Sequence, residues 1–167
     1  MEKEESILAG RCQNIIVIRI YGKGDFVNSQ FLKEYIYNLL ETECPEIVID
    51  LSECSTMDST FMGTLAGISS KLMQKDLHKL ILLNMNTHIE KLLTNLGLLY
   101  ILDTRNKIES KICSEMEPIN KRELSKIESI IHMIEAHEKL IETDTNNEVK
   151  FESVLRLLNK QLKSYTK

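Results

Sequence analysis

Long apolar runs and an excess of positive charge are both missing from this sequence of 167 residues. No run approaches the roughly 18 consecutive apolar residues that a membrane-spanning helix needs. The chain begins with the acidic stretch Met-Glu-Lys-Glu-Glu, and no apolar segment typical of a signal peptide follows it. Its 21 Lys and Arg against 25 Asp and Glu give a net charge of -4, which offers no basic field to phosphate backbones or anionic lipid. We therefore expect a cytoplasmic protein that binds neither nucleic acid nor membranes.

The residue groupings that support metal binding, disulfides or catalysis are missing as well. The four cysteines, at positions 12, 44, 54 and 113, are scattered without a C-x-x-C pair. His132 and His137 are five residues apart and lack the i, i+4 spacing of a helical zinc site, so we expect them to be exposed or to cap a helix. No glycine-rich phosphate loop and no pairing of a nucleophile with a base is recognisable. We expect no metal, no cofactor and no enzymatic activity.

The residues that are present fit an ordinary α/β domain. Apolar residues make up 43% and charged residues 28% of the chain, which is the balance of a folded globular protein. Apolar runs predict strands at residues 14–21, 46–51 and 79–85, and the spacing of apolar residues predicts helices at 28–42, 59–74 and 89–96. Asn28 or Ser29 is expected to cap the first of these helices. Strands joined through helices by short links indicate a right-handed parallel crossover.

The last third of the chain differs in character from the part before it. Residues 106–120 carry alternating charges and a proline, which is typical of an edge segment or a linker. Beyond them, two apolar stripes separated by turn residues at 143–147 predict a helical hairpin. We therefore divide the chain into an N-terminal tail (1–13), a core domain (14–113) and a C-terminal helical extension (119–167).

Four sequence blocks within the core resemble the STAS domain, a module shared by sulfate-transporter tails and anti-sigma factor antagonists. They read I-V-I-D-L-S, M-D-S-T-F-M-G, L-I-L-L-N-M and I-E-K-L-L-T-N-L-G-L, and begin at Ile47, Met57, Leu80 and Ile89. The resemblance covers roughly residues 14–105 and is to the antagonist branch. It implies a mixed β-sheet with helices packed on one face, to which the helical hairpin is added.

In the antagonist branch, the serine after the aspartate of the D-S motif is phosphorylated by an anti-sigma factor that is itself a serine kinase. The matching residue here is Ser59, with Thr60 as the second choice. The resemblance implies that the unphosphorylated protein binds this kinase and frees a sigma factor, and that a serine phosphatase would reverse the modification. Phe61 stands where the family usually has glycine, which changes the surface beside the phosphorylation site.

The resemblance also implies a partner-binding surface around this serine. Its expected members are Asp58, Ser59, Thr60, Phe61 and Met62, with Asp25, Asn28 and Ser29 from the preceding loop. A helix N-terminus tolerates a phosphate, and the added negative charge would disturb a docking face. Alternatively, Ser59 is only a helix N-cap, and Phe61 and Met62 pack in the core.

Two other functions stay open from the sequence. The two apolar stripes of the hairpin must be buried against the core, each other or a second chain. The protein could therefore be a scaffold or oligomerisation subunit that forms a homodimer through its C-terminal helices. A small-molecule enzyme or ligand sensor is the third possibility, and no motif supports it.

Overall fold

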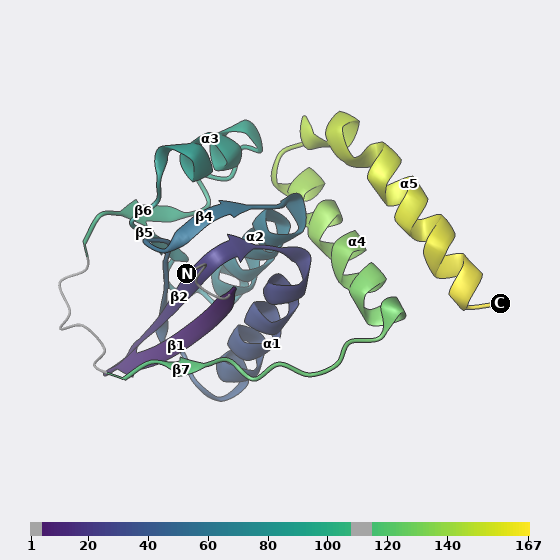
Figure 1. Cartoon of the computed structure of the whole chain (residues 1–167). Helices are drawn as coiled ribbons and strands as arrows, with labels where there is room; N and C mark the ends of the chain where they lie inside the picture. Colours follow the sequence, from purple (N-terminus) through teal and green to yellow (C-terminus); the bar gives the residue numbers. More distant parts are fainter. Residues whose placement is uncertain (1–4, 108–114) are drawn as a thin grey trace.

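The computed structural model describes residues 5–107 and 115–167, which are arranged around a mixed β-sheet (Figure 1). In this part of the chain the strands follow the order β6-β5-β3-β2-β1-β7, and β4 pairs with the C-terminal end of β2. β1 is antiparallel to both of its neighbours, and the remaining pairs are parallel. The strands are β1 (Ser6–Cys12), β2 (Ile15–Gly24), β3 (Glu46–Asp50), β4 (Cys54–Met57), β5 (Ile81–Leu83), β6 (Asp103–Arg105) and β7 (Glu117–Pro118).

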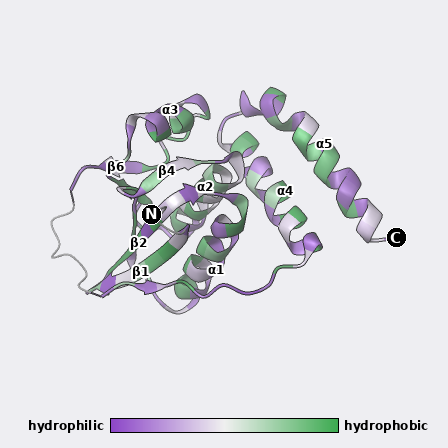
Figure 2. Ribbon diagram, viewed as in Figure 1, coloured by the Kyte–Doolittle hydropathy of each residue, from purple (hydrophilic) through white to green (hydrophobic). Residues whose placement is uncertain are grey.

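Three helices cover one face of this sheet, as the sequence predicts. They are α1 (Phe26–Thr42), α2 (Ser59–Gln74) and α3 (Thr87–Asn95). Because successive strand residues point to opposite faces, Ile16 and Ile18 join the helices in the main core, whereas Val17 and Val48 belong to a smaller cluster on the other face. Figure 2 shows hydrophobic residues concentrated in the strands and in α2.

The N-terminal tail expected over residues 1–13 is wrong for residues 6–12, because these form β1. β1 pairs with β2 along its whole length, from Ser6 opposite Tyr21 to Cys12 opposite Ile15. Ile7 is only 1% exposed and belongs to the main core. The tight turn between the strands places Gln13 at φ 55°, a conformation for which glutamine gives no sequence signal.

Helix α1 begins two residues earlier than predicted, at Phe26. Asp25 is its N-cap, since its Oδ1 accepts hydrogen bonds from the N–H groups of Val27 (3.1 Å) and Asn28 (2.8 Å). Asn28 and Ser29 therefore lie inside the helix, and the prediction that one of them caps it is wrong.

The C-terminal hairpin is present as predicted and consists of α4 (Lys126–Thr143) and α5 (Asn147–Tyr165). Ser125 and Glu128 form a capping box at the start of α4. Ile130 and Ile134 of α4 pack against Leu158 of α5, which gives the hairpin an apolar seam of its own. In Figure 1, α4 lies beside α2 and α5 lies on the outer side of α4.

The segment between the sheet and the hairpin is described only in part. β7 pairs with the outer edge of β1, which agrees with the edge segment expected there, whereas residues 108–114, including the cysteine at position 113, lie outside the described residues. Among the helices of the described ranges, none has the length and apolar character needed to cross a membrane.

Replacing Ile7 with alanine tests whether β1 is part of the folded core. We expect Ile7→Ala to lower the free energy of unfolding by about 2–4 kcal/mol, because it removes a fully buried side chain. Leu8→Ala is the control, since Leu8 faces the other side of the strand and is half-buried. Urea denaturation followed by circular dichroism measures both. Equal and small effects of the two substitutions would mean that residues 6–12 are not part of the folded core.

Candidate partner-binding site

The N-termini of α1 and α2 lie together at one edge of the sheet. β2 and β4 are parallel, with Gly24 paired to Met57, and the N–H of Asp58 donates to the carbonyl of Gly24 (2.9 Å). β2 leads into α1 through Asp25, and β4 leads into α2 through Asp58. Open α/β sheets commonly bind ligands beyond the carboxyl ends of their strands, so this edge is a natural place for a site.

Asp58, expected to contact a partner, ties the two helices together. Its Oδ1 accepts a hydrogen bond from the N–H of Phe61 (2.8 Å), and its Oδ2 accepts one from the N–H of Phe26 in α1 (2.9 Å). Burial raises the pKa of Asp58, and the nearby carboxylate of Asp25 adds to the rise, although backbone hydrogen bonds oppose it. Asp58 is the N-cap of α2, so the interpretation of Ser59 as the cap is wrong.

Ser59 is the first residue of α2 and hydrogen-bonds to a histidine in the C-terminal hairpin. Its Oγ lies 2.9 Å from Nε2 of His137, whose Nδ1 lies 2.6 Å from the carbonyl oxygen of Met133. A carbonyl only accepts, so Nδ1 of His137 carries a proton, and in the tautomer with its proton on Nδ1 the Nε2 atom is an acceptor. The hydroxyl of Ser59 therefore donates to His137.

His132 donates hydrogen bonds to α1 and α2, whereas His137 accepts one from α2. Its Nε2 lies 2.8 Å from Oγ of Ser29 and 3.4 Å from Oγ1 of Thr64. These hydroxyls donate their own protons to the carbonyls of Phe26 and Thr60, so both oxygens accept from Nε2–H of His132. Burial lowers the pKa of His132 to about 4, and the charge of a nearby lysine contributes. A neutral imidazole thus joins α4 to α1 and α2.

The expectation that His132 and His137 are exposed or act as caps is wrong, because they are 5% and 4% exposed and lie within α4. A separation of five residues turns them roughly 140° apart on a helix. Both side chains are nevertheless buried, because each one faces a neighbouring helix. His132 contacts α1 and α2. His137 lies between Ser59 of α2 and Phe151 of α5, and the centroids of the two rings are 5.1 Å apart.

Gly63 allows α4 to approach α2 very closely. A Cβ atom added at Gly63 would lie 2.2 Å from the carbonyl oxygen of Ala136 and 2.9 Å from its Cβ. Real atoms do not approach so closely, so any side chain at this position would push the two helices apart. The D-S motif of α2 therefore supplies both the serine and the glycine against which α4 packs.

Several residues expected at the partner-binding surface are buried. The exposed fractions are 3% for Asn28, 0% for Ser29, 4% for Thr60, 0% for Phe61 and 5% for Met62. Phe61 packs beneath the turn at Gly24, where an added Cβ would be 3.0 Å from its ring. The interpretation of Phe61 and Met62 as anchors for a partner is corrected: both belong to the main core.

Two exposed apolar residues at this edge were not anticipated. Phe26 and Val27, in the first turn of α1, are 42% and 36% exposed, and Asp58 receives the N–H of Phe26. Their signal in the sequence is a pair of large apolar residues directly after the turn that ends in Gly24 and Asp25. These two side chains are the exposed parts of the site, whereas Asp25, Asp58 and Ser59 are half-buried and the hydroxyl of Ser59 is covered by His137.

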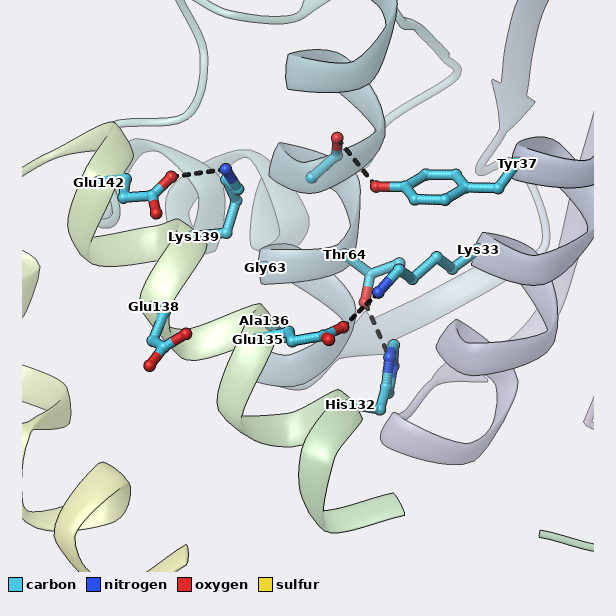
Figure 3. Close-up of a pocket in the computed structure, with 11 residues that line it drawn as sticks. Lys33, Tyr37, Gly63, Thr64, His132, Glu135, Ala136, Glu138, Lys139 and Glu142 are labelled. Atoms are coloured by element: carbon cyan, nitrogen blue, oxygen red, sulfur yellow. Dashed lines mark hydrogen bonds and ion pairs between the residues drawn. The ribbon is translucent and has the colours of Figure 1, made fainter. Parts of the chain in front are cut away.

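A hollow of about 240 Å³ lies between α1, α2 and α4, next to this site (Figure 3). His132 and Thr64 line its inner wall, and Lys33 forms an ion pair with Glu135 across it (2.5 Å). Lys139, the second lysine in the lining, forms an ion pair with Glu142, one turn further along α4. The lysines that line the hollow are thus neutralised. In residues 5–107 and 115–167, no cluster of three or more His, Cys, Asp or Glu could hold a metal ion.

Comparison with known proteins bears on the fold of the core domain. The family model of the STAS domain matches residues 7–111. Among curated proteins, no sequence matches this chain.

Solved structures of similar fold include anti-sigma factor antagonists. The phosphorylated form of SpoIIAA, the Bacillus cell fate determinant, has 20% identity, a TM-score of 0.51 and coverage of 61% of this chain and 93% of its own. An anti-sigma factor antagonist from Mycobacterium paratuberculosis has 18% identity and a TM-score of 0.52, covering 65% and 93%. RsbS of Moorella thermoacetica has 23% identity and a TM-score of 0.51, covering 64% and 90%. At these identities the likeness concerns the fold.

The depressed pKa of His132 predicts a pH dependence of stability. The unfolded residue titrates near 6.5 and the folded one at about 4, so the unfolded state binds the proton first. We expect the free energy of unfolding to fall by up to about 3 kcal/mol as the pH drops from 6.5 to 4. His132→Gln, which keeps an N–H donor, should lose this part of the slope, and His88→Gln, at an exposed histidine, should keep it. Denaturant titrations at several pH values compare them, and parallel curves for all three proteins would contradict the assignment.

Proposed function

This chain belongs to the STAS domain family, and on that basis we propose that it is a phosphorylation-regulated, partner-binding protein of the anti-sigma factor antagonist type. In this proposal the partner is an anti-sigma factor with serine kinase activity, and Ser59 is the residue that it modifies. A serine phosphatase returns the protein to its binding form. The exchange of partners takes place in the cytoplasm, and the protein acts by binding rather than by catalysis.

The position of Ser59 is the observation that carries this proposal. It is the first residue of α2, directly after the cap, and its hydroxyl lies at the edge where two helices begin. N–H groups and the positive end of the helix dipole make such a position tolerant of an anion. Thr60 is only 4% exposed, so it is the less accessible hydroxyl of the pair.

The surroundings of Ser59 explain how a phosphate would prevent binding. A phosphate adds about 1.5 to 2 negative charges, and the carboxylates of Asp58 and Asp25 are already at this edge. A partner that buries Phe26 and Val27 would have to remove water from these charges, which is costly when they are unpaired. Structures of SpoIIAA exist in both unphosphorylated and phosphorylated forms, which supports phosphorylation as a property compatible with this fold.

A charge substitution tests this switch. We expect Ser59→Asp to weaken binding of the kinase-type partner at least about tenfold, about 1.4 kcal/mol, whereas Ser59→Ala binds at least as tightly as the natural protein. Ser55→Asp is the matched control, because Ser55 is an exposed serine on the neighbouring strand β4 and the added charge is the same. Isothermal titration calorimetry with the purified partner gives the affinities. Equal affinities for the two aspartate variants would exclude Ser59 as the switch.

The surface of α5 favours a second candidate, a scaffold that dimerises through the hairpin. The exposed fractions of Val149, Val154 and Leu157 are 87%, 37% and 59%, and only two residues of α5 are buried. Val154 and Leu157 are three residues apart and therefore neighbours on the helix surface, and a patch of exposed apolar side chains is typical of an interface.

Light scattering tests this alternative on the whole protein. A scaffold should show the mass of a dimer at micromolar concentration, and Leu157→Glu should reduce it to a monomer because it would bury an unpaired charge. Asn159→Glu, which adds the same charge on an exposed position on the opposite side of the helix, should leave the dimer intact. A monomeric mass for the unmodified protein would rule out the scaffold.

A further inference from the structure

Helix α4 covers the part of α2 that carries the proposed phosphorylation site. Four polar contacts join α4 to the α1–α2 pair: His137 to Ser59, His132 to Ser29 and to Thr64, and Glu135 to Lys33. Figure 3 shows Glu135 of α4 directed toward Lys33 and His132 directed toward Thr64. The hydroxyl of Ser59 is therefore hydrogen-bonded to a residue of the same chain.

The interface that holds α4 differs from the interior of the domain. The residues of α4 buried against α2 include two histidines and Ala136, and they meet serine, threonine and glycine. Its isoleucines at 130 and 134 instead face α5. Leu140 is the fully buried aliphatic residue that α4 contributes to the main core. Hydroxyls and imidazoles can be hydrated when such an interface opens, so its separation costs less than opening an aliphatic core of the same size.

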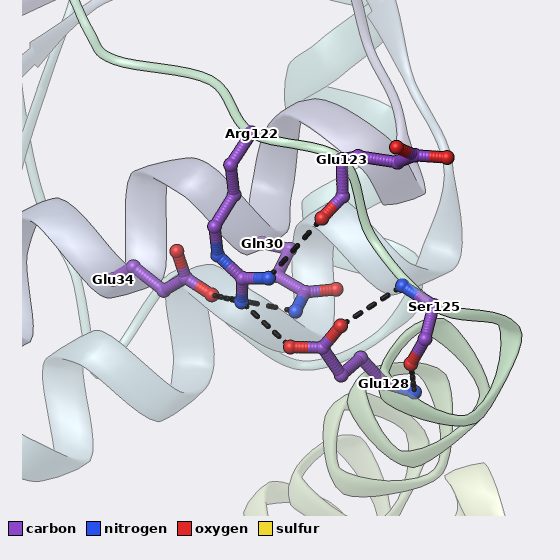
Figure 4. Close-up of polar contacts among 6 residues, drawn as sticks. All are labelled: Gln30, Glu34, Arg122, Glu123, Ser125 and Glu128. Atoms are coloured by element: carbon purple, nitrogen blue, oxygen red, sulfur yellow. Dashed lines mark hydrogen bonds and ion pairs between the residues drawn. The ribbon is translucent and has the colours of Figure 1, made fainter.

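The packing of α4 against α5 allows the two helices of the hairpin to separate from the core together. Its apolar seam, formed by Ile130, Ile134 and Leu158, lies between α4 and α5 and need not open when α4 moves away from α2. The contacts of α5 that must open are the hydrogen bond from Nδ2 of Asn147 to the carbonyl of Leu96 and the packing of Phe151 against the main core. The chain before α4 acts as a tether, since Arg122 pairs with Glu34 of α1 and with Glu128 of α4, both at 2.8 Å (Figure 4). A tethered helix remains at a high effective concentration near its binding surface and competes strongly with an external partner.

We infer that α4 is an intramolecular inhibitor, which occupies the Ser59 face of α1 and α2 and must leave it before a kinase-type partner can bind there. The regulatory role of this contact rests on the proposed function, whereas the occlusion of Ser59 can be tested without any partner. A kinase must bring its nucleotide in line with a free serine hydroxyl, and here the hydroxyl donates to His137 beneath α4. Displacement of the hairpin thus controls both docking and phosphorylation.

Thiol labelling of the full chain measures this occlusion directly. Ser59→Cys is introduced after the cysteines at 12, 44 and 113 have been replaced by serine; Cys54 is kept, because burial raises its pKa to about 11 and makes it unreactive. The probe is a bulky polyethylene glycol maleimide, and the same protein without Ser59→Cys gives the background rate.

Two substitutions in α4 release the helix without altering α1 or α2. Ala136→Leu introduces volume at the close approach to Gly63, and Leu140→Ala removes the aliphatic residue that anchors α4. Glu138→Leu is the matched control, since it places leucine on an exposed position of α4. We expect either releasing substitution to increase the labelling rate at position 59 at least about tenfold, and the control to stay within twofold.

The outcomes separate this inference from the proposed function. Equal labelling rates in the parent, Ala136→Leu, Leu140→Ala and control proteins would overturn the inference, whatever the partner does. If labelling accelerates and the partner also binds Ala136→Leu about tenfold more tightly than the control, the inhibitory role is supported. If labelling accelerates while binding is unchanged, the partner docks elsewhere; the inhibitory role and the proposed binding face are then overturned, and the physical occlusion of Ser59 stands.

Discussion

The carboxylate of Asp58 accepts hydrogen bonds from the first turns of two helices, and the geometry of the site depends on it. One oxygen holds the N–H of Phe61 in α2 and the other holds that of Phe26 in α1. Burial of this carboxyl is costly, and the helix N–H groups offset the cost by satisfying both oxygens. Because the two N-termini are fixed in this way, Ser59 and the exposed Phe26 and Val27 share one edge of the sheet.

The same edge is where the C-terminal hairpin meets the STAS core. The hairpin has two seams of different chemistry: an aliphatic one between α4 and α5, and a polar one with small residues between α4 and α2. Aliphatic burial is the larger stabilising effect, about 25 cal/mol per Å², so the first seam keeps the hairpin intact. Hydrogen bonds exchange with water at a small net cost, so the second seam is suited to reversible contact. This division of roles connects the packing of the extension to the proposed regulation of Ser59.

Much of the fold follows from local patterns in the sequence. The apolar runs of β2, β3 and β5 and the periodic faces of α1 and α2 predict the parallel crossovers, and the two stripes near the C-terminus predict the hairpin. β1 was not predicted, because its short, partly polar segment becomes a strand only when it pairs with β2. The cap of α1 was placed wrongly, and that of α2 was left open between Asp58 and Ser59, because several polar residues precede each helix and only the backbone geometry selects among them.

The site itself could be predicted only in part. The motif around Ser59 identifies the position, but the contacts of this residue come from His137, 78 positions later in the chain. Such a pairing depends on how the hairpin docks, and neither histidine carries a local signal for it. For the same reason, helical spacing alone could not show whether Phe61 and Met62 are buried or exposed.

The central claim is that Ser59 is a regulated phosphorylation site. Mass-spectrometric mapping of phosphate on the protein isolated from its native cells tests it most directly. We expect phosphate on Ser59 in a fraction of the molecules that changes with growth conditions, with the buried Thr60 unmodified. A protein that carries no phosphate at Ser59 under any condition, while still binding its partners, would contradict the account and leave Ser59 as a residue that serves only to hold α4 in place.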